Sequence, residues 1–492
     1  MLKKIGKQLQ IVLLLGLSGT LSAQGTLTLE QCRQMALDHN QQVKVAKEGL
    51  NAANSLRKAA FTQFLPDFGF TGSYMYMNKE YSLLSENLFL PVIPYTAVSA
   101  DGTLDVSKLG VNDIVINPST GQPVLDANGN PVFQHYTYLP KDEAKLDMRN
   151  VFLFDAGLTQ PIFTGGKITN LYKSAGYNQK IAEQNLRMQN DEVVYKVEEL
   201  YWKAVSLGEK VKLAETYKSL VDTLVRNLEN YYSEGIIINN DLLRAKVKQD
   251  EAELMLMRAR DGQSLCRMAL CSAIGLPIDT LVSPVDSLAI EPEKPVMNVS
   301  GNYLTDRPEL GMLRYSSNLA EAGVNISKSR FLPDVGLTAN YMYGNPNPFN
   351  GFEKEFGGAW NVAVVCRIPI FHFGERFHTL HVAQSEKASA DLKLQEAEEQ
   401  ITLQVRQARF NHDESLKKVW QNERLVKQTE ENLRVVNDRF KEGILKSSDV
   451  LEAQSLWQKA SSDYVEAKTE CKLAGTWLQK VNGTLSETST KK

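Results

Sequence analysis

Acidic residues are the side chains in this sequence that could bind an ion, and they stand at two predicted reversals of the chain. Asp449 and Glu452 are three residues apart and would share one face of a helix, and Asp241 follows the equivalent reversal in the first half. If several copies faced a common axis, these carboxylates would form a ring that attracts cations. Aspartate is also a preferred helix cap, and the spacing of Asp449 and Glu452 fits a capping box, so both interpretations stay open. Arg244 takes the place of Glu452 in the first half, so the pair would come from the second half alone.

No group of residues in this sequence points to catalysis. His372, His378 and His381 lie close together, but a zinc site needs more ligands and a closed shell. The sequence has no nucleophile motif and no phosphate-binding loop, so we expect no enzyme, no cofactor and no metal site. The cysteines are odd in number and widely scattered, which is not the pattern of a disulfide framework. They are Cys32, Cys266, Cys271, Cys366 and Cys471.

The chain begins like an exported protein. Lys3, Lys4 and Lys7 precede the apolar run 11–17, and small residues follow up to Ala23. This is the order of a secretory signal, so we predict a signal peptide over residues 1–23. The formal net charge of −3 offers no basic face for nucleic acid. No later stretch is long and apolar enough for a spanning helix, so the exported chain is either soluble or crosses a membrane as strands.

The sequence is an internal repeat. Phe64-Leu-Pro-Asp67 recurs 267 residues later as Phe331-Leu-Pro-Asp334, and Pro161-Ile-Phe163 recurs 208 residues later as Pro369-Ile-Phe371. The offset falls by 59 residues between the two blocks, which places an insertion in the first half. The predicted organisation is a first structural repeat over 24–274, an equatorial connection over 275–305, a second structural repeat over 306–480 and a polar tail over 481–492.

Four short segments alternate apolar and polar residues with a period of two, as amphipathic strands do. In one of them Trp360, Val362 and Val364 oppose Asn361. Such strands suit a membrane barrel, although a soluble sandwich with one wet face is an alternative. Four strands cannot close a barrel around a pore, whereas three copies would supply twelve. The predicted strands cover about 67–78, 149–161, 334–344 and 358–369, and a long, proline-rich loop that we expect to be extracellular fills 78–147.

Helical patterns of unusual length follow the strands. Apolar residues step by three and four through 165–233 and 374–441, in the same register in both halves, as Val197 and Val405 illustrate. At 1.5 Å per residue, a helix of about 65 residues spans roughly 100 Å, several times the diameter of a domain. Shorter helices are predicted over 28–62, 241–274 and 449–480, the first two stacked end to end beside the first long helix. Prolines mark the strand–helix junctions at Pro66, Pro161, Pro333 and Pro369.

Several of these motifs resemble the TolC family of outer membrane efflux proteins. Leu27-Thr-Leu-Glu30 and Arg307-Pro-Glu-Leu310 look like the openings of its two repeats, and the segments 160–166 and 368–374 look like its strand-to-helix joints. The resemblance covers essentially the whole mature chain. It implies a mainly α protein with a membrane β-barrel, built as a long coiled-coil-like helical barrel plus four strands per subunit. A homotrimer would then carry a 12-stranded barrel.

The resemblance also implies a function. We expect an exit duct of a tripartite efflux pump or a type I secretion system, placed in the outer membrane among its lipids and extending into the periplasm. Its partners would be a periplasmic adaptor (membrane fusion) protein and an inner membrane transporter of the RND or ABC type, and its cargo small molecules or polypeptides. The alternative is a periplasmic or surface coiled-coil structural protein without a channel.

In this family the periplasmic entrance lies where each long helix turns back. Here Asp449, Glu452 and Asp241 would line it, and Gly235 and Gly443 would supply the left-handed residue that ends a helix. Some members of the family close the entrance with a tyrosine and an arginine, where this sequence has Phe440 and Leu445. The expected adaptor contacts are Gly235, Ile236, Ile237, Ile238, Gly443, Ile444 and Leu445.

Overall fold

The computed structural model describes residues 25–290 and 303–485, which divide into two units. One unit is helical and holds the residues up to Phe61, Gly166–Phe331 and the residues from Phe371 onward. The other holds Thr62–Gly165 and Leu332–Ile370 and contains the strands. The predicted signal peptide, residues 291–302 of the predicted connection and most of the predicted tail lie outside the described residues.

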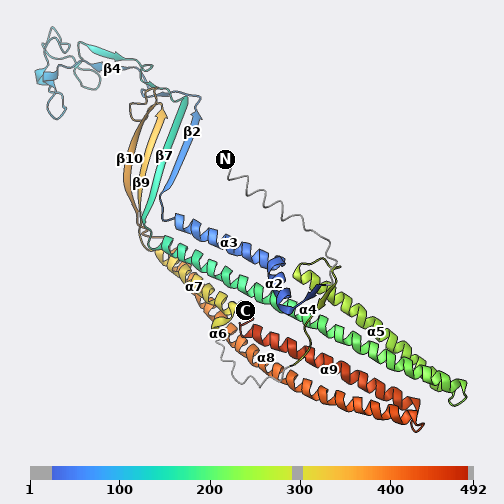
Figure 1. The fold of residues 1–492 in the computed structure, drawn as a ribbon. Helices are drawn as coiled ribbons and strands as arrows, with labels where there is room; N and C mark the ends of the chain where they lie inside the picture. Colours follow the sequence, from blue (N-terminus) through green and yellow to red (C-terminus); the bar gives the residue numbers. More distant parts are fainter. Residues whose placement is uncertain (1–24, 291–302, 486–492) are drawn as a thin grey trace, which may run out of the picture. The chain divides into compact units, whose positions relative to one another are not determined.

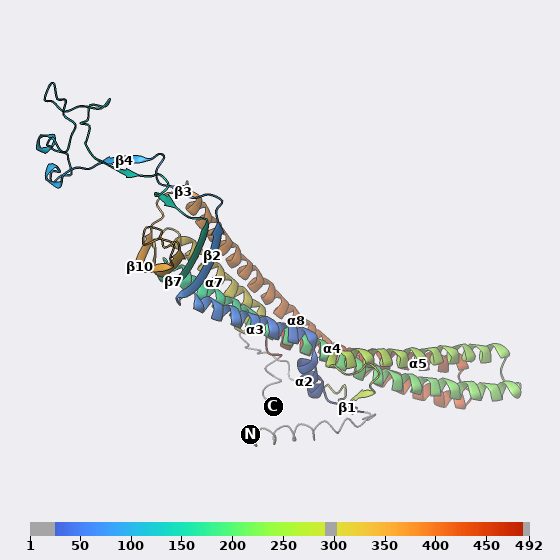
Figure 2. The same cartoon turned by 90° about the horizontal axis from the view of Figure 1, so that it is seen from above.

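Two helices of 67 residues dominate the helical unit: α4 (Lys167–Ser233) and α8 (Glu375–Lys441). Each turns back into a shorter helix, α5 (Asn239–Ile274) or α9 (Ser447–Val481). Figure 1 shows α4 beside α5 and α8 beside α9, and Figure 2 shows the first pair again after a quarter turn. The bounds of these helices lie within two residues of those expected from the heptad patterns.

The shorter helices differ from the prediction. A single helix was expected over 28–62, but the structure has α2 (Leu29–His39) and α3 (Gln41–Thr62). Asn40 between them has an extended backbone, and its side-chain oxygen accepts a hydrogen bond of 2.8 Å from the N–H of Gln42. Asparagine competes with the helix in this way because its short side chain can bond the neighbouring backbone. The second half breaks similarly between α6 (Tyr303–Asp306) and α7 (Pro308–Ser329), where Pro308 begins the helix.

The heptad seam of α4 is the core of the helical unit. Val197 and Tyr201 belong to a buried cluster with side chains of α2 and α5. Further along, Val221 and Leu228 are fully buried in a second cluster that includes residues of α5 and α9. Burying a valine or leucine side chain contributes about 1.5–3 kcal/mol, so this seam holds the helices together.

A small parallel pairing fixes the predicted connection to the helices. Strand β1 (Gly25–Leu27) pairs with β8 (Val282–Pro284). The hydroxyl of Tyr201 donates a 2.6 Å hydrogen bond to the carboxylate of Asp286, which also accepts the N–H of Leu29 at 3.2 Å. In the stretches 25–290 and 303–485, no helix combines the length and hydropathy needed to span a lipid bilayer.

The second unit is built around a four-stranded antiparallel sheet in the order β10-β9-β7-β2. Its strands are β2 (Asp67–Tyr76), β7 (Asn150–Phe163), β9 (Asp334–Asn345) and β10 (Gly357–Arg367). Along one row, Phe70 pairs with Ala156, Ala156 with Tyr341, and Tyr341 with Trp360. The apolar alternations of the four strands therefore fall on one common face.

The four junction prolines are not equivalent. Pro66 and Pro333 stand directly before β2 and β9, as expected of residues that separate helix from strand. Pro161 lies inside β7, where the register shifts between Pro161 and Phe163, because proline cannot donate to the ladder. Pro369 follows the end of β10.

The segment expected to be one long loop, 78–147, is partly paired into ribbons. β3 (Tyr81–Ser82) pairs with β6 (Lys145–Leu146), and β4 (Leu88–Pro91) pairs with β5 (Tyr136–Leu139). Beyond these ribbons Ala97, Ile114 and Phe133 are buried. Short 3-10 turns lie at η1 (Tyr95–Ala97) and η2 (Val106–Lys108).

Candidate functional site

The first reversal joins α4 to α5 through an apolar turn. Gly235 has a left-handed backbone with φ of 74°, as predicted, and the N–H of Ile236 bonds the carbonyl of Tyr231 at 2.8 Å. This ends the helix while leaving Ile236 and Ile238 exposed. Ile237 packs against the buried cluster of α4 and α5 instead.

The second reversal joins α8 to α9 with the same backbone. Gly443 has φ of 78°, and the N–H of Ile444 bonds the carbonyl of Arg439 at 3.0 Å. Ile444 is exposed and Leu445 is half-buried. Each turn therefore presents an apolar side chain to its surroundings.

The aspartates do not cap the returning helices as the sequence suggested. The cap positions are Ile238 and Lys446, so Asp241 and Asp449 are each the third residue of their helix. The carboxylate of Asp449 reaches back and accepts the N–H of Lys446 at 3.0 Å. The start of α5 has no side-chain cap bond. Both carboxylates still lie in the first helical turn, where the helix dipole favours negative charge.

Glu452 shares its surroundings with basic groups of the same chain. It is exposed, and together with Arg244 and Lys248 it borders a hollow of about 530 Å³ between α5 and α9. Arg244 and Glu452 occupy equivalent positions in the two repeats, so the duplicated helices bring opposite charges to one hollow. Val247 and Leu451 are the apolar residues of its lining.

An aromatic contact joins the two reversals. The rings of Tyr231 and Phe440 lie 6.3 Å apart at the ends of α4 and α8. Both pack against the cluster that holds Leu228 and Val450. At this place some members of the family have a tyrosine and an arginine that close the entrance, whereas this chain has an aromatic contact.

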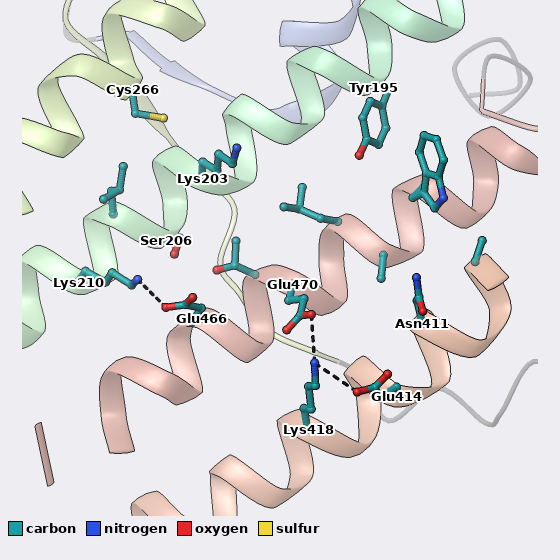
Figure 3. Close-up of a pocket in the computed structure, with 16 residues that line it drawn as sticks. Tyr195, Lys203, Ser206, Lys210, Cys266, Asn411, Glu414, Lys418, Glu466 and Glu470 are labelled. Carbon is teal, nitrogen blue, oxygen red and sulfur yellow. Dashed lines mark hydrogen bonds and ion pairs between the residues drawn. The ribbon is translucent and has the colours of Figure 1, made fainter. Parts of the chain in front are cut away.

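A larger hollow of about 800 Å³ lies among α4, α8 and α9, with Cys266 of α5 at its edge (Figure 3). Its charges are paired: Lys210 lies 3.2 Å from Glu466, and Lys418 lies 3.3 Å from Glu470. The wall of this hollow therefore carries paired charges of both signs rather than an excess of one sign. Sequence reasoning missed it, and the signal that could have found it is the acidic pair 466 and 470, one helical turn apart on α9.

A buried ion pair, which the sequence analysis did not predict, links the two repeats. Nη2 of Arg33 lies 2.5 Å from Oε1 of Glu198, whose side chain is 2% exposed. Thr476 of α9 donates to the other carboxylate oxygen at 2.8 Å. The pair links α2, α4 and α9. Because Arg33 and Glu198 are 165 residues apart in sequence, no local pattern predicts their contact.

The histidines and cysteines form no recognisable centre. Among the described side chains, no group of three or more His, Cys, Asp or Glu could hold a metal ion. His372 lies with Nδ1 2.6 Å from a guanidinium nitrogen of Arg376. The five cysteines all lie in the described residues and form no disulfide, and Cys366 on β10 is the exposed one among them.

Comparisons with known proteins give this architecture a class. The family model described as "Outer membrane efflux protein" matches residues 136–276 and 299–484. The alkaline protease secretion protein AprF of Pseudomonas aeruginosa is 22% identical over 338 residues, 67% of this chain and 69% of AprF. The cobalt-zinc-cadmium resistance protein CzcC of Cupriavidus metallidurans is 22% identical over 236 residues, 47% of this chain and 54% of CzcC.

The fold matches solved channels. The outer membrane channel CmeC of Campylobacter jejuni superposes with a TM-score of 0.71 at 16% identity, covering 93% of this chain and 86% of CmeC. Paired long helices joined to a four-stranded sheet are thus the fold of an outer membrane channel. The chain belongs to the outer membrane efflux protein family.

Membership confirms the predicted fold class, the location in the outer membrane with extension into the periplasm, and the function of an exit duct. The family consists of transport proteins.

Proposed function

We propose that three copies of this chain stand side by side and enclose one duct, with twelve strands forming its barrel in the outer membrane and the paired helices forming its periplasmic tube. The order of the sheet supports this arrangement, because β10 and β2 are its two edge strands. Edge strands carry a row of backbone groups ready to pair with another chain. Pairing β10 of one copy with β2 of the next closes the sheet without an edge.

One observation on the helices carries the proposal. Phe377, Leu392, Leu403 and Phe410 are exposed and fall along one side of α8, away from its buried stripe of Ile401 and Val405. An apolar stripe on an otherwise polar surface marks an interaction site.

A complementary apolar surface lies on the first repeat. Val45 and Leu56 on α3, and Leu254 and Leu265 on α5, are exposed. Contacts between two different surfaces of identical chains close into a ring when the rotation allows it. We therefore pair the α8 stripe of one copy with the α3 and α5 side of the next.

The reversals are the proposed contacts with the periplasmic adaptor. Their exposed apolar side chains, Ile236, Ile238 and Ile444, suit a protein partner. The adaptor would connect the duct to an inner membrane transporter of the RND or ABC type. AprF is named for protease secretion and CzcC for metal resistance, so the transporter, rather than the duct, would select the cargo.

The assembly is tested on the purified full-length protein in detergent and in a planar bilayer. We expect the mass of a trimer and a steady ion conductance. A monomer that passes no ions would contradict the duct and support the structural alternative without a channel.

The adaptor contact is tested with Gly443→Arg and Ile238→Asp in cells. Ile238 is the cleaner position because its side chain is 65% exposed, whereas Ile237 packs against the core. Export should fall at least tenfold while the trimer and its conductance remain, and Ile238→Val should export normally. Normal export by the charged variants would overturn the adaptor assignment.

A further inference from the structure

We propose that a hollow on the apolar face of the four-stranded sheet binds one fatty acyl chain of an outer membrane lipid. The inference rests on the proposed function in one respect, which is that this face of the sheet is the one turned toward the membrane. It adds a defined lipid site to that surface.

The hollow lies where one small residue stands among large ones. In the row of paired residues Phe70, Ala156, Tyr341 and Trp360, only Ala156 lacks a ring. A hollow of about 380 Å³ lies over Ala156 and the rings around it. Its lining is almost entirely carbon and consists of Phe70, Phe154, Ala156, Tyr341 and Tyr343.

The position of the hollow excludes a neighbouring copy as its occupant. Ala156 lies on β7, which pairs with β2 on one side and β9 on the other. A second copy can pair only at the outer edges of β2 and β10. The face above Ala156 therefore stays open to the surrounding membrane after the sheet is closed.

The chemistry of the lining selects a hydrocarbon. Water in the hollow would lack the two to four polar partners that hold a buried water. An empty hollow would forfeit the dispersion contacts of five side chains. A flexible acyl chain supplies these contacts and leaves no polar group unsatisfied.

An aromatic network places the hollow at a definite depth. Toward the loop ends of the strands, the ring of Phe152 lies 4.9 Å from that of Tyr74 and 6.1 Å from that of Phe356, and Phe356 stacks on Tyr343 at 5.5 Å. Aromatic girdles of this kind mark the interface between lipid chains and headgroups. The hollow begins beside Tyr343, so the bound chain would enter it just below its headgroup.

The test is native mass spectrometry of the purified trimer after a delipidating detergent wash and re-addition of lipid A or phosphatidylethanolamine. The wild type should keep about one acyl lipid per protomer, and the mass shift tells which of the two is held. Ala156→Phe places a ring in the middle of the hollow and should lower the retained lipid at least fivefold. Ala156→Val fills it partly, suits a strand, and should give an intermediate value.

Ala339→Phe is the matched control, because Ala339 lies on the same face in the neighbouring row and does not line the hollow. It should retain lipid like the wild type. Equal retention by Ala156→Phe and the wild type, or equal loss in Ala339→Phe, would overturn the site. Conductance should be the same in all of them, so a failed lipid test leaves the duct intact.

Discussion

The helices α4 and α8 have the same length and repeat each other in sequence, yet they are buried to different extents. α4 has sixteen buried residues and packs against α2, α5, α7 and α9, whereas α8 has nine and packs mainly against α7 and α9. The seam of α4 stays buried to Leu228, near its end, while that of α8 is mostly half-buried beyond Val419, where Leu433 is its one buried residue. One copy of the duplicated helix is interior to the subunit, and the other lies at its edge.

The other repeated elements divide in the same way. α3 and α7 are both 22 residues long, but α7 packs between α4 and α8 whereas α3 buries only Val43, Ala46 and Ala53. In the sheet, β7 and β9 are interior while β2 and β10 are the edges. Duplication supplied two equivalent halves, and folding placed one copy of each element in the interior of the subunit and the other at its edge, where the proposed ring would bring it against the next copy.

The largest expected effect comes from charging the edge helix. Phe410→Arg together with Leu403→Arg should abolish the trimer, because both side chains are exposed in one chain and would be buried between copies. The helix content of the resulting monomer, measured by circular dichroism, should not change. Phe410→Leu with Leu403→Met keeps the stripe apolar and should remain trimeric. If the doubly charged variant elutes as a trimer, α8 is not the edge.

Substitutions on the interior helix α4 should instead lower the free energy of unfolding of the subunit itself. Glu198→Gln removes the buried counter-charge of Arg33, which keeps only its pair with the exposed Glu30, and should lower the free energy of unfolding by about 3 kcal/mol. Glu423→Gln on α8 removes an acid from an exposed pair with Lys427 and should cost less than about 1 kcal/mol. Guanidinium unfolding followed by circular dichroism measures both. Equal losses would remove the distinction between the helices.

The link between the edge helix and the interior should depend on acidic pH. Hydrogen bonds from Lys387 and then from Ser317 of α7 lower the pKa of Asp391 on α8 below its ordinary 3.8. Because the folded-state pKa is lowered, the stabilisation is present above that ordinary, unfolded-state pKa and is lost as pH falls through the folded-state pKa. Amide exchange in α7 should therefore be constant from pH 7 to 5, after correction for the intrinsic exchange rate, and rise below about pH 4.

Asp391→Asn is the control for this pH effect, because it cannot titrate. Its corrected exchange in α7 should differ little between pH 5 and pH 3. A rise in this variant as steep as that of the wild type would assign the effect to another carboxyl group.

The smallest effect is expected at the two reversals. Asp449→Ala removes the bond to the N–H of Lys446 and should destabilise the protein by about 1 kcal/mol, whereas Asp241→Ala, at a helix start without a side-chain cap bond, should change stability by less. Thermal unfolding measures the difference.

Ion selectivity separates capping from an acidic ring at the entrance. If the ring exists, Asp449→Asn should also reduce the preference of the conductance for cations over anions. An unchanged preference would contradict the acidic ring and limit the role of Asp449 to its hydrogen bond at the start of α9.

The sequence predicts the regular parts of this protein well because their periods are strict. Alternation in each strand, as at Trp360 and Val362, was enough to assign its apolar face, and pairing then brought the four faces together. The heptads likewise located both long helices.

The break at Asn40 was missed because asparagine also occurs within helices, and Pro161 because a bulge tolerates it inside a strand. Local sequence also cannot show which duplicate becomes the edge, since Val197 and Val405 carry the same signal and are equally buried. Likewise, the pairing of Arg33 with Glu198 and the hollow at Ala156 depend on residues brought together from distant segments.

The edge assignment is tested most directly by a photo-crosslinking amino acid at position 410 of α8, where the native Phe410 is 68% exposed. Irradiation of the assembled protein should give covalent dimers and trimers, with the crosslinked peptides mapping to α3 or α5 of a neighbouring copy. Crosslinks that stay within one chain, or that join α8 to α8, would contradict the arrangement proposed for the duct.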